Sequence, residues 1–174
     1  MLRDVPRMET NPITETTYRV SLAGDIIDKI TQESDVIVQY GMGILTGDIL
    51  QAPTYGVISY HHRDIQEYRG GPPGFWEFLY GEEQVGITVQ RLSEELDAGE
   101  IVLVEHVNID QAGSWPAVRQ LLVDASPSLL LCALRRLADD SFSPESLNQL
   151  GPIYRAQERG LREYGMLIYR TLVK

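Results

Sequence analysis

Short apolar runs of strand length alternate with segments of helical periodicity along this chain of 174 residues. The run over 35–45 opens with three consecutive β-branched residues, which is typical of a buried strand. Apolar residues at helical spacing fill 21–34 and 114–140. The predicted strands are 17–20, 35–45, 56–60, 84–92 and 101–109. The alternation predicts an α/β fold with a mostly parallel sheet flanked by helices.

The expected domain organisation is one α/β domain with a short extension at each end, because 174 residues suffice for a single core. We expect a flexible N-terminal arm over 1–16, the α/β domain over 17–150 and a C-terminal helical extension over 151–174. Within the long helical segment, Ser114 is a candidate N-cap. Pro127 is expected to kink that helix or to split it.

The surface charge argues against nucleic acid as a partner, since the net charge is −10 and the pI is about 4.7. No apolar run approaches the roughly 18 residues of a membrane span, so no membrane association is expected. The polar N-terminus lacks the apolar segment of a secretory signal. Cys132 is the only cysteine, which excludes an internal disulfide. These features predict a cytoplasmic protein.

Two adjacent histidines, His61 and His62, end the run at 56–60. Because side chains alternate along a strand, the two rings should point to opposite faces and cannot easily share one metal ion. His106 lies on a different predicted strand, and no His-x-x-x-His pair exists. No metal site is therefore expected.

A carboxylate gives one of these histidines a possible chemical role. Asp97 lies in a loop just before a predicted strand, 36 residues after His61. A carboxylate beside an imidazole orients it and raises its basicity, which suits proton transfer. The alternative from spacing alone is a pair of loop histidines with hydrogen-bond partners and a set of solvated loop acids.

Four separated motifs resemble the formyltransferases that use 10-formyltetrahydrofolate, including the methionyl-tRNA, glycinamide ribonucleotide and sugar-amine enzymes. In chain order, over residues 34–140, they are "YGMGIL", "GVISYHHRDIQEYRGGPP", "QVGITVQRL" and "LDAGEIV". The resemblance implies a Rossmann-like fold. It also implies 10-formyltetrahydrofolate as the donor substrate, a small amine as the acceptor and no metal.

The family's catalytic trio is Asn, His and Asp. Position by position, His61 and Asp97 match the histidine and the aspartate, whereas Ser59 replaces the asparagine. Loss of such an oxyanion donor typically lowers the rate by roughly 10²–10³. The resemblance also implies two walls of a pterin slot, which are Met42, Gly43, Ile44 and Leu45, and Leu92, Ser93, Glu94, Glu95 and Leu96.

Family members carry a Gly-rich βαβ unit before the catalytic strand, but here that strand starts near residue 56 and no Gly-x-Gly-x-x-Gly is present. The resemblance thus implies a partial, N-terminally shortened fold. A second copy in a homodimer, or a partner chain, would then complete the acceptor site. Two alternatives stay open: a non-catalytic module that binds formyl-folate, and a formyltetrahydrofolate hydrolase.

Overall fold

The computed structural model describes residues 7–41, 43–95, 99–147 and 150–173. The chain divides after Val57 into two compact units, Met1–Val57 and Ile58–Lys174, and each is described by itself. Residues 1–6 of the expected N-terminal arm lie outside the described residues. The predicted boundaries at 16 and 150 stay predictions.

The first unit contains a small three-stranded sheet, in the order β1-β2-β4, and one helix. Strand β2 runs parallel to β4 and antiparallel to β1. The predicted single strand over 35–45 is two short strands, because Gly41 lies between them with a φ of 74° that ends the extended conformation. The elements are β1 (Ile13–Thr14), β2 (Arg19–Ser21), α1 (Gly24–Glu33), β3 (Ile37–Gln39), β4 (Ile44–Leu45) and the 3₁₀ turn η1 (Asp48–Leu50).

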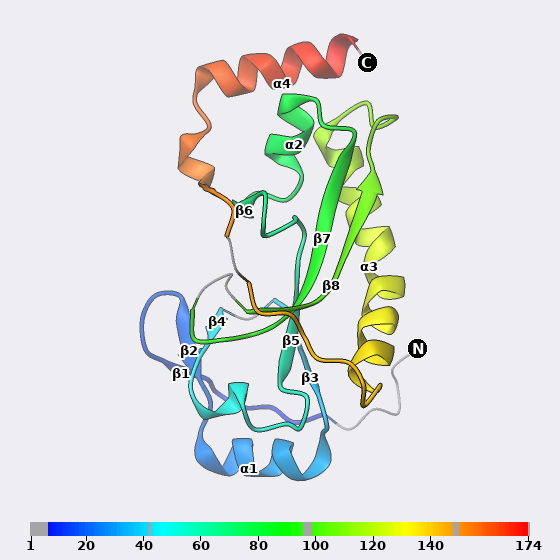
Figure 1. Cartoon of the computed structure of the whole chain (residues 1–174). Helices are drawn as coiled ribbons and strands as arrows, with labels where there is room; N and C mark the ends of the chain where they lie inside the picture. The colour runs from blue at the N-terminus through cyan, green and yellow to red at the C-terminus, as the bar shows by residue number, and fades with distance from the viewer. Residues whose placement is uncertain (1–6, 42, 96–98, 148–149, 174) are drawn as a thin grey trace. The chain divides into compact units, whose positions relative to one another are not determined.

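The second unit is built on the strands β5, β7 and β8 (Figure 1). Strand β7 lies between β5 and β8 and is antiparallel to both. The α/β class is confirmed, but the prediction of mostly parallel strands is wrong for this unit. The reason is that β7 and β8 are joined by a short loop, whereas parallel neighbours need a long crossover. The elements are β5 (Val57–His61), β6 (Arg69–Gly70), α2 (Phe75–Tyr80), β7 (Gln84–Arg91), β8 (Glu100–Asn108), α3 (Trp115–Leu137), β9 (Ile153–Tyr154), the 3₁₀ turn η2 (Ala156–Glu158) and α4 (Leu161–Val173).

Helix α3 packs along β8 and β7 and closes the core of this unit (Figure 1). Ser114 is its N-cap, as predicted, and its side chain accepts a hydrogen bond from the Ala117 amide. The helix continues through Pro127 without a break. Its inward residues are Val118, Leu122, Leu129, Ala133 and Leu137.

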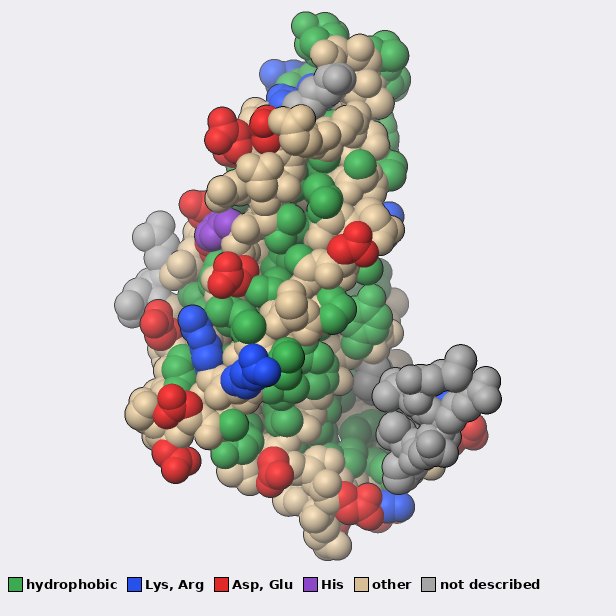
Figure 2. All heavy atoms as spheres, turned by 90° about the vertical axis from the view of Figure 1, so that its right-hand side faces the viewer, with side chains coloured by type: hydrophobic (Ala, Val, Ile, Leu, Met, Phe, Trp, Pro, Cys, Tyr) green, Lys and Arg blue, Asp and Glu red, His purple; other side chains and the backbone are tan. Residues whose placement is uncertain are grey.

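The outward face of α3 carries apolar side chains among charged and polar ones. Figure 2 shows hydrophobic side chains along this face, and Leu121, Val123 and Leu131 are among the exposed ones. By length and composition α3 is the one helix in the described part of the chain that passes the test for a membrane span. Core helices of soluble proteins pass the same test, and α3 does pack against a sheet.

An aromatic cluster joins α2 to the C-terminal segment. Phe75, Trp76 and Leu79 of α2 are buried, and Tyr154, Met166 and Leu167 pack against them. The Trp76 and Tyr154 rings lie 5.3 Å apart. Helix α4 therefore anchors residues 153–173 to the second unit by apolar packing.

Candidate functional site

The two adjacent histidines at the end of β5, His61 and His62, lie in different environments. The Tyr60 and His62 rings stack at 5.8 Å with an interplanar angle of 12°. Tyr60 Oη donates to the Ser126 carbonyl at 2.5 Å, and His62 Nε2 lies 2.9 Å from Ser126 Oγ. Both side chains therefore face α3. Because side chains alternate, Ser59 and His61 belong to the other face of the strand.

His62 has a structural role in this arrangement. Ser126 Oγ donates its proton to the Leu122 carbonyl at 2.8 Å, so the hydroxyl oxygen accepts from the His62 ring. Burial lowers the pKa of His62 from its ordinary value of 6.5, which favours the neutral ring. His62 therefore packs against α3.

Ser59 and His61 form a polar row with their neighbours on β7. Ser59 pairs with Gln90, and His61 pairs with Thr88. Ser59 is only 9% exposed, and His61 Nε2 is shielded from solvent. Directly opposite residues of an antiparallel pair share a face, with Cβ atoms about 5 Å apart. The Ser59 hydroxyl, the His61 imidazole and the Gln90 amide therefore lie close together on one face of the sheet.

Gln90 is a site candidate that the sequence analysis did not identify. It is 4% exposed, and its Oε1 accepts no hydrogen bond from any residue that the structure describes. A buried amide beside Ser59 is a ready polar group for a ligand. The signal was weak in the sequence, because only the register of β5 against β7 brings Gln90 to Ser59.

Asp97 lies outside the described residues, so its distance to His61 stays a prediction. The loop that carries it begins directly after Arg91, which pairs with Ile58 on β5. At the base of this loop, Arg91 Nε donates to Glu100 Oε2 at 2.7 Å. This ion pair links β7 to β8 where the loop begins. Arg91 lies opposite Ile58, the residue before Ser59, so the loop starts close to Ser59.

The residues of the predicted pterin slot lie in separate units. Position 43 requires glycine, because a Cβ there would lie 2.6 Å from the Tyr18 carbonyl oxygen. Ile44 and Leu45 form β4, and Leu45 is buried. On the other stretch, Leu92 and Ser93 are partly buried and Glu94 and Glu95 are exposed. Met42 and Leu96 lie outside the described residues, and the slot stays a prediction.

Comparison with known proteins identifies the family. A family model described as formyl transferase matches residues 6–134. The methionyl-tRNA formyltransferase of Caldicellulosiruptor saccharolyticus is 34% identical over 115 residues, which are 66% of this chain and 37% of that protein. The chain spans less than half the length of the curated relatives that it matches.

Two solved structures share the fold. The formyltransferase PseJ from Anoxybacillus kamchatkensis, in complex with UDP-4,6-dideoxy-4-formamido-L-AltNAc and tetrahydrofolate, superposes with a TM-score of 0.59 at 19% identity, covering 78% of this chain and 69% of that one. A formyltetrahydrofolate deformylase from Pseudomonas syringae gives a TM-score of 0.58 at 23% identity, covering 71% and 44%. The family match, the relative and the Rossmann-like α/β fold agree, and the chain belongs to the formyl transferase family.

Proposed function

We propose that this chain transfers a formyl group from 10-formyltetrahydrofolate to an amine acceptor. The observation that carries the proposal is the shared face of Ser59 and His61 on β5, beside the strand whose loop bears Asp97. Membership of the formyl transferase family supports the reaction class. The tetrahydrofolate held by PseJ supports a folate donor.

The proposed chemistry is acyl transfer. The acceptor nitrogen attacks the formyl carbon, and the carbonyl oxygen becomes an oxyanion near Ser59 and His61. His61, oriented by Asp97, takes the proton from the attacking nitrogen. The proton then passes to the departing folate nitrogen as its bond to carbon breaks. These steps require no metal ion.

Gln90 is proposed to supply the amide that the family's asparagine would provide at position 59. Serine has one short donor, so its reach to the oxyanion is limited. Gln90 lies directly across from Ser59 and is buried, and its Nε2 group would donate to the oxyanion, where a hydrogen bond to a developing charge is strong. Ser59 and Gln90 would then share the role of one longer side chain.

Hydrolysis of the formyl group is the second candidate, with water in place of the amine. The likeness in fold to a formyltetrahydrofolate deformylase favours it. A non-catalytic module that holds formyl-folate is a third candidate, and Ser59 in the asparagine position favours that one. The proposed transfer assigns the acceptor side to a second copy or a partner chain.

Turnover assays separate these candidates. We expect the full chain to convert 10-formyltetrahydrofolate to tetrahydrofolate only when an amine, such as an amino-sugar nucleotide, is present. His61→Ala and Asp97→Asn should abolish this conversion. His62→Gln is the matched control, because His62 packs against α3 on the other face of the strand from Ser59 and His61, and this variant should keep the activity. Formate release without an amine would identify a hydrolase, and absence of any turnover would contradict an enzymatic function.

A further inference from the structure

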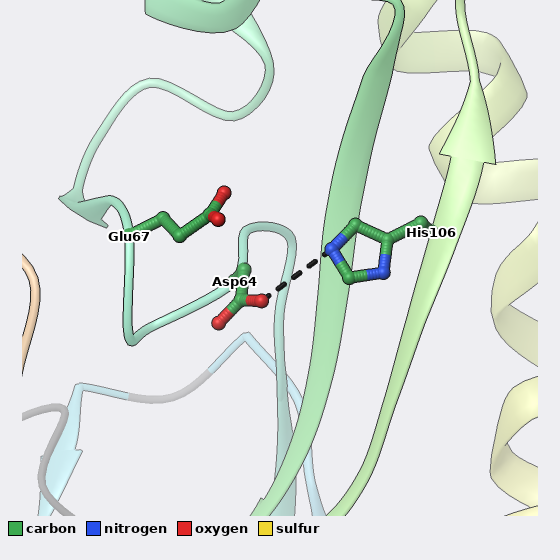
Figure 3. A group of neighbouring side chains, drawn as sticks. All are labelled: Asp64, Glu67 and His106. Carbon is green, nitrogen blue, oxygen red and sulfur yellow. Dashed lines mark ion pairs between the residues drawn. The ribbon is translucent and has the colours of Figure 1, made fainter.

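Asp64, Glu67 and His106 converge on one point in the second unit (Figure 3). Each offers one ligand atom, and these atoms all lie within 4.8 Å of one another. His106 Nε2 lies 3.4 Å from Asp64 Oδ2. Two ligands about 2.1 Å from one ion at a tetrahedral angle are about 3.4 Å apart. The pair therefore already has the spacing of two ligands on a common metal ion.

A tight turn that starts at Asp64 packs against β7 and brings these groups together. Asp64 Oδ1 accepts from the Gln66 amide at 2.9 Å, and the Asp64 carbonyl accepts from the Tyr68 amide at 2.7 Å. Oδ1 thus holds the turn and Oδ2 faces the His106 ring. A Cβ on Gly86 would lie 2.6 Å from Asp64 Cβ, so only glycine lets the turn approach the strand here. Gly86 pairs with His106 on β8.

The three groups line a cavity that has room for an ion. Asp64, Glu67 and His106 all border this cavity, whose volume is about 360 Å³. Glu77 borders it as well, but its buried carboxylate is ion-paired with Arg63, whose guanidinium nitrogen lies 3.6 Å from Glu77 Oε2. The candidate ligands are therefore the other three groups, and solvent in the cavity can reach an ion bound between them.

We propose that Asp64, Glu67 and His106 bind a divalent first-row transition-metal ion such as Zn²⁺ or Co²⁺. An imidazole nitrogen with two carboxylate oxygens is a donor set that suits these ions, and solvent in the cavity completes the coordination. The bound ion would link the turn that follows His61 to β8. Sequence spacing did not reveal this site, because its ligands come from a turn and a distant strand.

The ion pair between Asp64 and His106 is the competing explanation of the geometry. It accounts for two of the three groups and leaves the Glu67 carboxylate, which offers a third ligand atom within 4.8 Å of the other two. A metal ion accounts for all three. The two explanations differ in whether the chain takes up a metal at all.

The test is Co²⁺ and Zn²⁺ binding by the full chain without a histidine tag. Calorimetry gives the number of ions bound, and the visible absorption of Co²⁺ reports the coordination. We expect one ion per chain. His106→Ala and Asp64→Asn should each weaken binding by roughly 100-fold, and Glu67→Gln by roughly tenfold or more.

Glu105→Gln is the matched control, since this neighbour of His106 is also exposed but belongs to the other face of β8. It should bind like the wild type. Circular dichroism melts confirm that each variant is folded, and His106, with a side chain 43% exposed, is a safe position to change. Absence of Co²⁺ and Zn²⁺ binding in the wild type, or binding unchanged in both His106→Ala and Asp64→Asn, would overturn the proposal.

Discussion

At the scale of single residues, the contrast between His61 and His62 follows from the alternation of side chains along β5. His62 is bound to Ser126 of α3 and stacked on Tyr60, and His61 belongs to the face shared with Ser59. The sequence was sufficient to separate the two faces. It was not sufficient to say which ring packs, because α3 is distant along the chain.

His62 makes stability dependent on pH. Its pKa in the folded chain lies below the ordinary 6.5, so below that pH the unfolded chain binds more protons and the free energy of unfolding falls. We expect the melting temperature to decrease on acidification from pH 7.5 to 5.5. His62→Gln keeps a donor for Ser126 and removes the titration, so its decrease should be smaller. Equal decreases in the two proteins would refute this role.

Gln90 has a test that separates catalysis from packing. Gln90→Ala should lower kcat by roughly 10²-fold with little change in the KM for the folate, because a donor to the oxyanion acts in the transition state. Adding Ser59→Asn to that variant should restore part of the rate. Unchanged kcat in Gln90→Ala, or no recovery in the double variant, would exclude the shared-donor role.

At the scale of elements, the sequence predicted most strands and helices but not their pairing. The N-cap at Ser114 and the strand periods of β7 and β8 are local features, and these predictions are confirmed. Strand direction depends on how the loops connect, and the hairpin between β7 and β8 makes this part of the sheet antiparallel. Pro127 does not end α3, because packing of the helix against the sheet outweighs the local cost of the proline.

Two adjacent leucines of α3 differ in burial, which allows a test of how the helix packs. Leu122 is 1% exposed and Leu121 is 38% exposed. Leu122→Ala should lower the free energy of unfolding by about 2–5 kcal/mol through loss of burial and the cavity that remains. Leu121→Ala should lower it by less than about 1 kcal/mol. Urea denaturation of both variants measures the difference, and similar losses would contradict the packing of α3 described above.

For the molecule as a whole, the family and the α/β fold agree with each other. Four motifs in order identified the family from the sequence, and the family match over residues 6–134 agrees. The sequence alone did not indicate the cluster of Asp64, Glu67 and His106 or the position of Gln90, because both depend on contacts between distant segments.

Binding of formyl-folate underlies the proposed transfer, and it can be measured by calorimetric titration with 5-formyltetrahydrofolate, a stable isomer of the donor. Wild type and Met42→Arg should be compared, because an arginine at 42 is designed to block the predicted pterin slot. We expect micromolar binding by the wild type and its loss in the variant. Absence of binding by the wild type, or equal binding by both proteins, would refute the proposed folate site.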